Sequence, residues 1–278
     1  MTITEADFEF ISSVVRAESA IVLERGKEYL VESRLLPVAK ESGHPTIADL
    51  IKQLRRSPMG PLRGQVIEAM TTNETSFFRD VHPFHALSDT VLPELIRARA
   101  AERSLNIWSA ASSSGQEAYS IAMLVSDALV GQPGWRVRLL ATDISQQMLD
   151  RTTSGLYSQL EVNRGLPAQR LVKHFTRQGT HWQVNEDLRR MVECRLLNLD
   201  AAWPMMPSMD VIFLRNVLIY FDIPTKQRIL ARVRSLLRPD GYLFLGGAET
   251  TLNLDAGFER VQIGNAPAYR LRSEGKTA

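Results

Sequence analysis

The sequence is poor in cysteine, and this scarcity limits the chemistry open to it. Cys194 is the single cysteine among 278 residues, so no disulfide can form within the chain. It lies in VECRLLNL, which we interpret as a buried strand, so we expect its thiol to be a small core side chain and not a nucleophile. None of the five histidines forms a ligand-like cluster with it, and we therefore expect no metal site.

Long apolar runs and a strong net charge are also missing. No run approaches the roughly 20 apolar residues that a membrane-spanning helix needs, so we expect no membrane insertion. The opening residues, MTITEADFEF, are acidic where a secretory signal would be basic, and we expect a cytoplasmic protein. The formal net charge of +2 gives no support to nucleic-acid binding.

What the sequence does contain is two different patterns of secondary structure. Residues 1–75 show apolar side chains at helical spacing in several short segments and no strand, which predicts a small all-helical N-terminal domain. Thr46 and Asp49 have the spacing of a helix cap, and Pro37 lies in a helical stretch that it can kink or break. Residues 76–278 alternate strand and helix, which predicts a doubly wound, mostly parallel α/β sheet.

One segment breaks this alternation. Residues 155–187 are polar and punctuated, and HFTRQGTHWQV has the pattern of a hairpin around residues 178–179, which predicts an inserted antiparallel β-subdomain. Further on, we expect a helix from Thr225 to Leu237 with Asp222 as its cap. It is followed by RPDG, which we interpret as a turn, and by strands in YLFLGG, FERVQIG and AYRLR.

Ligands of doubly wound sheets bind at the carboxyl ends of the strands, so the residues there are candidates for a site. The first strand is followed by SAASSSGQEAYS, whose small residues let a ligand approach but lack the GxGxxG pattern of nicotinamide dinucleotide folds. Glu117 in this segment either balances the helix dipole or attracts a cation. Because a carboxylate repels pyrophosphate, the second alternative favours S-adenosylmethionine, which carries an ammonium and a sulfonium but no phosphate.

Polar residues follow the next three strands as well. Asp143 is placed to accept both hydroxyls of a ribose, or to cap the next helix. Asn198 can bind a purine edge or form a turn. Arg215 and Asn216 adjoin a strongly apolar run, where a charged side chain needs a partner or a ligand. Tyr220, in the same run, is either core packing or part of a site.

The segment MTTNETSFFRD joins the two predicted domains. Asn73, Thr75 and Arg79 would suit a polar linker, but Phe77 and Phe78 would not. We therefore expect this segment to pack against the rest of the protein.

These segments, in this order, resemble the CheR family, the chemotaxis receptor glutamate methyltransferases. The resemblance is carried by MTTNETSFFRD, SAASSSGQEAYSIA, ATDIS, GLYSQ with NRGLP, LLNLD, FLRNVLIYFD and LRPDGYLFLGGAET. It covers nearly the whole chain, and FFRD and RNVLIYF are its most specific parts. It implies a class I, Rossmann-like S-adenosylmethionine methyltransferase sheet and methyl transfer to glutamate side chains of methyl-accepting chemotaxis receptors.

The resemblance also implies roles for individual residues. Arg79 matches the partner of the cofactor's methionine carboxylate, Glu117 the acid that helps to hold the cofactor, and Asp143 the ribose ligand. Arg215 and Asn216 match the segment beside the reacting methyl group. The residues implied to bind S-adenosylmethionine are Asn73, Thr75, Arg79, Glu117, Asp143, Asn198, Leu199, Arg215 and Asn216, with Asn198 and Leu199 framing the adenine, and those implied to act in catalysis are Tyr220, Arg215 and Asn216.

The chain departs from the family pattern at two places. Gln116 replaces the first of two usual acids, while Glu117 keeps the second. The hairpin at residues 178–179 is shorter than in members that grip a C-terminal receptor pentapeptide, so we expect activity without that tether. The insertion matches the subdomain that contacts receptors. Lys27 and Arg34, seven residues apart on one helical face, either meet a receptor helix or form a solvated face.

The implied reaction needs neither a general base nor a metal. Glutamate is ionised at neutral pH, since its reference pKa is about 4.3, and the leaving group is a neutral thioether. The residues are then needed for alignment and for the removal of water. The alternatives are a methyltransferase with a different acceptor, such as a small molecule, and a non-catalytic sensor of S-adenosylmethionine. We expect a monomer.

Overall fold

The computed structural model describes residues 3–57 and 60–272. The proximity of Cα atoms divides the chain into two units. The first holds the residues up to Thr72 together with Tyr220–Thr225, and the second holds Asn73–Ile219 together with the residues from Lys226 onward. The predicted domain boundary at residue 75 stays a prediction. Within the described ranges, no helix combines the length and the apolar composition needed to cross a membrane.

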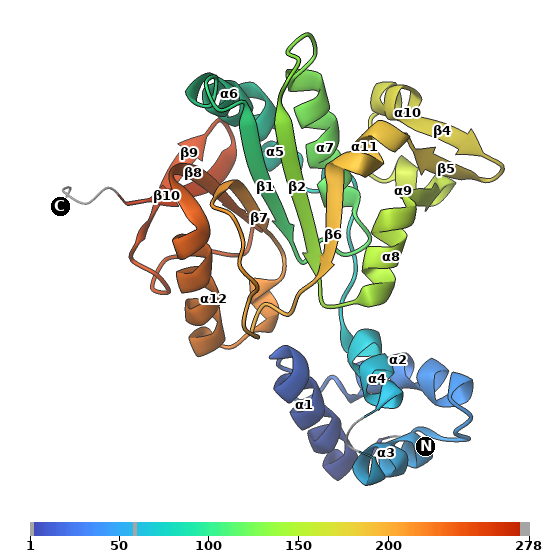
Figure 1. The fold of residues 1–278 in the computed structure, drawn as a ribbon. Helices are drawn as coiled ribbons and strands as arrows, with labels where there is room; N and C mark the ends of the chain where they lie inside the picture. Colours follow the sequence, from blue (N-terminus) through green and yellow to red (C-terminus); the bar gives the residue numbers. More distant parts are fainter. Residues whose placement is uncertain (1–2, 58–59, 273–278) are drawn as a thin grey trace. The chain divides into compact units, whose positions relative to one another are not determined.

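Four helices form most of the first unit, and they confirm the predicted all-helical domain (Figure 1). They are α1 (Glu5–Ser19), α2 (Glu28–Glu41), α3 (Ile47–Arg56) and α4 (Pro61–Met70). The hydroxyl of Thr46 accepts a hydrogen bond from the backbone N–H of Asp49 at 3.1 Å, so it caps α3 as its spacing predicts. Pro37 lies inside α2 without ending it. The apolar faces of these helices share one core.

The second unit is built on a 7-stranded sheet with the order β6-β2-β1-β7-β8-β10-β9. The strands are β1 (Ser104–Ala110), β2 (Arg136–Asp143), β6 (Val192–Leu196), β7 (Met209–Leu214), β8 (Leu237–Leu245), β9 (Phe258–Ile263) and β10 (Ala266–Leu271). The first five in this order pair in parallel, and β10 pairs antiparallel with β8 and β9. The strand order reverses beside β1, which defines the switch point of a doubly wound fold. The predicted fold class is therefore confirmed.

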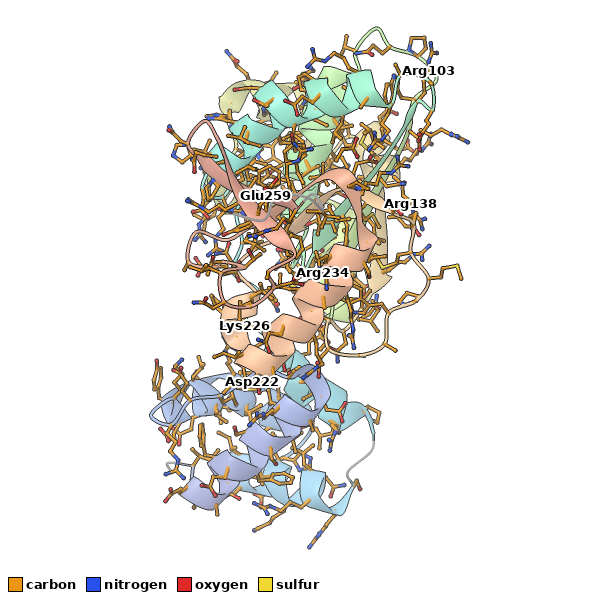
Figure 2. The ribbon with its side chains drawn as sticks, turned by 90° about the vertical axis from the view of Figure 1, so that its left-hand side faces the viewer. Arg103, Arg138, Asp222, Lys226, Arg234 and Glu259 are labelled. Carbon is orange, nitrogen blue, oxygen red and sulfur yellow. The ribbon has the colours of Figure 1, made fainter. Side chains whose placement is uncertain are left out.

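Helices cover both faces of this sheet. Successive side chains of a strand point to opposite faces, so Phe213 of β7 joins the core that includes the buried side of α7 (Gln116–Ala128). Trp108 of β1 is fully buried outside that core and meets the ring of Trp203 edge-on at a centroid distance of 5.1 Å. Arg232 of α12 (Ile223–Leu236) lies over that second ring. Figure 2 shows α12 with Lys226 and Arg234 along its length.

The insertion between α8 (Gln146–Ser154) and β6 forms the predicted antiparallel β-subdomain. Its strands are β3 (Leu156–Ser158), β4 (Phe175–Gln178) and β5 (His181–Val184), in the order β3-β5-β4. Its helices are α9 (Gln159–Asn163), α10 (Ala168–His174) and α11 (Glu186–Met191). Before β1, the chain forms α5 (His82–Ala86), a π-helical turn at Leu87–Val91 and α6 (Leu92–Ala98).

Two sequence predictions need correction. Strand β6, which holds Cys194, is at the edge of the sheet and not buried within it, and the cysteine is only half-buried. RPDG does not precede β8 as a turn but lies inside that strand as an irregularity, because Met209 pairs with Leu237 while Val211 pairs with Tyr242. The predicted cap of α12 is confirmed, since Asp222 accepts a hydrogen bond from the backbone N–H of Thr225 at 3.0 Å.

Candidate active site

The segment that precedes the sheet, residues 73–81, packs as the sequence predicts. The hydroxyl of Ser113, in the loop after β1, donates to the carbonyl oxygen of Asn73 at 2.7 Å. Phe77 is fully buried, and its ring meets that of Tyr157 edge-on at a centroid distance of 5.0 Å. The loop after β1 and the β-subdomain therefore hold this segment, which also carries Thr75, at the carboxyl end of the sheet.

Arg215, directly after β7, is the centre of an ion-pair network at the same edge. Its Nη1 donates to Glu117 Oε2 at 3.0 Å, and its Nη2 donates to Asp80 Oδ2 at 2.7 Å and to the carbonyl oxygen of Arg79 at 2.9 Å. The hydroxyl of Ser109 donates to the second oxygen of Glu117 at 2.8 Å. Three segments that are distant in the sequence are thus tied together by one guanidinium.

The environment of Glu117 makes its charge sensitive to what binds nearby. Burial raises the pKa of its carboxyl above the ordinary value, while the guanidinium of Arg215 and the hydroxyl of Ser109 oppose that rise. An added cation at this carboxylate would favour the ionised form further. Arg79 is half-buried, and its side chain donates to the carbonyl oxygen of Glu74 at 2.9 Å.

Asp143, at the end of β2, holds two neighbouring loops through backbone amides. Its Oδ2 accepts from the N–H of Ser113 at 2.8 Å, and its Oδ1 accepts from the N–H of Ser145 at 2.9 Å. The cap of α8 is Ser145 and not Asp143, because the hydroxyl of Ser145 accepts from the N–H of Met148. A carboxylate offers about four lone-pair positions, so this structural task does not exclude ribose binding.

The loop after β6 is fixed by its own turn and by α12. Asn198 Oδ1 accepts from the backbone N–H of Asp200 at 2.9 Å, which is the turn that the sequence left open as an alternative to purine binding. Leu199 is buried, and its carbonyl oxygen accepts from the indole of Trp203 at 3.1 Å and from Arg232 at 3.2 Å. These contacts place Asn198 and Leu199 at the carboxyl edge of β6.

The residues after Arg215 form a tight turn. Asn216 has a left-handed backbone with φ of +58°, and its Oδ1 is buried without a hydrogen-bond partner. Tyr220 ends the 3₁₀ turn Leu218–Tyr220 and is half-buried. Within the first unit, the carbonyl oxygen of Tyr220 accepts from the backbone N–H of Val22 at 2.9 Å.

Strain and unpartnered atoms gather at this edge of the sheet. Among the described residues, nine that are not glycine have positive φ, and six of them are Phe78, Asp80, Val81, Ala111, Ser113 and Asn216. Such conformations cost about 1–3 kcal/mol each and cluster at functional sites. Buried side-chain atoms without a partner include Ser112 Oγ, Arg215 Nε and Asn216 Oδ1. Three of the five such atoms among the described residues lie at this edge, and each still has hydrogen-bonding capacity for a water or a ligand.

Two residues of the ion-pair network, Asp80 and Ser109, were not predicted from the sequence, and neither was Glu249, whose carboxylate accepts hydrogen bonds from the backbone N–H groups of Asn216 and Val217. Asp80 is part of FFRD, and Ser109 is the second-last residue of β1 and the first of the segment SAASSSGQEAYS, so both lay in segments that the sequence had already marked. Glu249 also lay in a marked segment, LRPDGYLFLGGAET, and the rule that strand ends carry function would have reached it had that rule been applied to β8.

Comparison with protein families decides the family of this chain. Residues 73–266 match the CheR methyltransferase, SAM binding domain, and residues 6–71 match the CheR methyltransferase, all-alpha domain, where SAM is S-adenosylmethionine. The chain belongs to the CheR methyltransferase family. The predicted family and the predicted S-adenosylmethionine-binding methyltransferase domain are thereby confirmed.

Similar proteins cover almost the whole chain. Chemotaxis protein methyltransferase 1 of Pseudomonas aeruginosa is 41% identical over 98% of this chain and 100% of its own length. Chemotaxis protein methyltransferase Cher2 of Pseudomonas putida is 39% identical, with the same coverage. The chemotaxis protein methyltransferase of Escherichia coli is 35% identical over 93% of this chain and 89% of its own length. The resemblance therefore includes both family domains.

Proposed function

We propose that this protein transfers a methyl group from S-adenosylmethionine to glutamate side chains of chemotaxis receptors and forms glutamate methyl esters. The family match and the names of the relatives, which are chemotaxis protein methyltransferases, support this function. The observation that carries it is the Glu117–Arg215 pair, which sets a buried carboxylate with raised pKa beside unpartnered polar atoms at the carboxyl end of β1 and β7.

The residues present fit the cofactor. Glu117 would attract the ammonium of the methionine part, and Arg79 would pair with its carboxylate, as a guanidinium fork suits. Asp143 would accept the ribose hydroxyls, with Asn198 and Leu199 at the adenine. The buried, unpartnered atoms of Arg215 and Asn216 give this edge of the sheet acceptor and donor capacity that a polar ligand would use. Asn73 and Thr75 complete the proposed set from the packed segment before the sheet.

The chemistry calls for alignment more than for proton transfer. When bound, S-adenosylmethionine supplies an electrophilic methyl group on a sulfonium. Charge is neutralised as the methyl group moves to the carboxylate, so strong cationic contacts to the acceptor would stabilise the ground state more than the transition state. We therefore assign positioning of the acceptor to Tyr220 and Asn216, and we assign a supporting role to Arg215, which precedes Asn216 in the chain and is fixed by its ion pairs with Asp80 and Glu117.

The acceptor is proposed to lie on the helical cytoplasmic region of a receptor, with the protein acting as a monomer. The β-subdomain and the N-terminal domain are the parts proposed to contact it. In the N-terminal domain, Arg34 is a weaker candidate for receptor contact than the sequence suggests. Its side chain donates to the carbonyl oxygens of Met70 and Thr71 at 2.7 and 3.0 Å and so is not a free surface cation. Lys27 pairs with Glu24 at the surface at 2.9 Å and stays a candidate for receptor contact.

Methyl transfer is tested directly by incubating the protein with methyl-labelled S-adenosylmethionine and receptor-containing membranes. Base-labile label on the receptor band is the expected result, and it should vanish when the receptor glutamates are replaced by alanine. Cofactor binding without label on any receptor would favour the alternative of a different acceptor or a sensor of S-adenosylmethionine. Adding or deleting a C-terminal pentapeptide on the receptor tests the expected independence of that tether, since the two receptors should be labelled at equal rates.

A further inference from the structure

Glu249, in the loop after β8, accepts hydrogen bonds from four backbone amides. Its Oε2 accepts from the N–H of Asn216 at 2.8 Å and of Gly246 at 2.7 Å. Its Oε1 accepts from the N–H of Val217 at 2.9 Å and of Ile219 at 3.3 Å. One carboxylate therefore connects the loop after β8 to the turn after β7, which carries residues of the proposed site.

The turn after β7 needs such support. Asn216 has a left-handed backbone, which asparagine adopts more readily than most residues with a side chain but which is still a minor conformation that the surroundings have to select. The N–H groups of residues 216, 217 and 219 all converge on Glu249. Charge-assisted hydrogen bonds of this kind are about twice as strong as neutral ones, so the carboxylate is well suited to fix the turn.

Gly246 allows the two loops to approach. A Cβ added at this glycine would lie 2.7 Å from Asn216 Nδ2, 2.7 Å from Glu249 Oε2 and 2.8 Å from the backbone nitrogen of Asn216. Two of these three atoms belong to Asn216, whose side-chain Oδ1 is buried without a hydrogen-bond partner. The close packing at Gly246 and the carboxylate of Glu249 thus act on the same turn from two directions.

We propose that Glu249 is a positioning residue for methyl transfer, which fixes the turn of Asn216–Ile219 and thereby the Asn216 side chain and the chain leading to Tyr220. The inference rests on the proposed function. Glu249 itself touches neither cofactor nor acceptor in this assignment. Its loss should therefore lower the rate of the chemical step more than it weakens cofactor binding, because Asn216 is one of several proposed cofactor contacts, whereas a displacement of about 1 Å in an aligned site can cost about 100-fold in rate.

The test compares Glu249→Gln and Gly246→Ala with the wild type. A glutamine keeps the size of the side chain but sets an NH₂ group against amide donors, and the alanine would push the turn away while keeping the carboxylate. We expect kcat for receptor methylation to fall by about 10- to 100-fold in each variant. KM for the receptor should stay within about threefold of the wild type, and the Kd for S-adenosylhomocysteine should rise by a smaller factor than kcat falls, because the other proposed cofactor contacts are kept.

Asp255→Asn is the matched control, because Asp255 is also a carboxylate in the connection between β8 and β9. It accepts from the N–H of Gly257 at 2.8 Å and from Arg234 at 3.0 Å (Figure 2 labels Arg234), and these hydrogen bonds lie outside the turn after β7. This control should lose stability without losing kcat. Equal losses of kcat in the control and in Glu249→Gln would show a general structural effect and overturn the proposal.

Amide hydrogen exchange gives a readout that does not depend on activity. In Glu249→Gln, the amides of Asn216, Val217, Ile219 and Gly246 should exchange faster than in the wild type. In Asp255→Asn, the same four amides should exchange at the wild-type rate. If Glu249→Gln methylates receptors as fast as an active wild type, the positioning role is refuted and the proposed function is not. A wild type that binds the cofactor but methylates no receptor would refute the proposed function.

Discussion

The guanidinium of Arg215 and the carboxylate of Glu117 form an ion pair of 3.0 Å that joins the residue after β7 to the first turn of α7. The two side chains are almost withdrawn from solvent, with exposed fractions of 1% and 11%. Breaking a buried pair by removing one partner costs about 3–5 kcal/mol, because the other charge is left uncompensated. The ion pair therefore fixes the position of the Glu117 carboxylate, which the proposed function assigns to the ammonium of the cofactor.

The first prediction concerns the pH dependence of cofactor binding. Burial raises the pKa of Glu117 in the free protein, and a bound ammonium would favour its ionised form and lower that pKa again. Binding should therefore release a proton at mildly acid pH, and affinity should fall as pH falls through the raised pKa. Calorimetry between about pH 4 and 7, where the cofactor's amino group stays protonated, measures this slope.

Glu117→Gln provides the control for that prediction. The amide cannot titrate, so its affinity should be nearly independent of pH in the same range. At pH 7 it should bind the cofactor about 10- to 100-fold more weakly, as expected when a charged hydrogen bond worth about 1.5–3 kcal/mol is lost. An unchanged pH slope in Glu117→Gln would assign the titration to another group and contradict the proposed ammonium contact.

The second prediction concerns Tyr220. Tyr220→Phe removes one hydroxyl, and we expect turnover to fall by about tenfold, or ~1.4 kcal/mol in the activation barrier, with little change in cofactor affinity. Tyr242→Phe is a suitable control, because its hydroxyl donates to Glu94 at 2.6 Å on a different part of the sheet. Single-turnover kinetics with labelled cofactor measure the rate of methyl transfer separately from the affinity for the cofactor. Equal turnover in wild type and Tyr220→Phe would remove Tyr220 from the proposed site.

The fold was predictable because its signals are local and repeat. Apolar strands followed by amphipathic helices recur through the second unit, and the hairpin at β4 and β5 has its own polar pattern. The edge position of β6 was not predictable, since the composition of VECRL does not show whether one or two strands pair with it. The irregularity at residues 238–241 was also missed, because Asp240 there is held by Arg99, which lies far away in the sequence.

The candidate site was predictable one residue at a time but not as a network. Glu117, Asp143 and Arg215 each follow a strand, and the rule for doubly wound sheets finds them separately. Their connections depend on the strand order, which brings β1 and β7 together although about 100 residues separate them in the chain. The role of Glu249 depends on backbone amides of another loop, and no side-chain pattern in the sequence reports those.

The third prediction concerns the contact between the β-subdomain and the segment at residues 73–81. Gly165 has φ of +89°, and a Cβ there would lie 2.0 Å from the carbonyl oxygen of Phe77. Gly165→Ala should therefore displace the segment that carries Thr75 and Arg79, lower the unfolding temperature and weaken cofactor binding. Thermal unfolding and calorimetry on the same preparation check both effects.

Gly179→Ala separates the clash from the backbone strain. Gly179, at the hairpin tip, also has positive φ, of +59°, but an added Cβ would meet no atom within 4 Å. Both variants share the cost of a left-handed conformation, about 1–2 kcal/mol, so the difference between them reports the clash with Phe77. Equal cofactor affinities in the two variants would show that this contact does not support the cofactor segment.

The last prediction separates a structural arginine from a candidate for receptor contact. Arg34 is half-buried and binds the carbonyl oxygens of Met70 and Thr71, which end α4, so Arg34→Ala leaves backbone acceptors without a donor. We expect it to destabilise the protein by about 1–3 kcal/mol. Lys27→Ala breaks only the exposed pair with Glu24 and should leave the unfolding temperature unchanged.

The rate of receptor methylation, measured at a temperature where both variants are folded, then decides which residue contacts the receptor. A slower rate with Lys27→Ala alone would assign receptor contact to that residue, whereas a slower rate with Arg34→Ala alone would return Arg34 to the receptor surface.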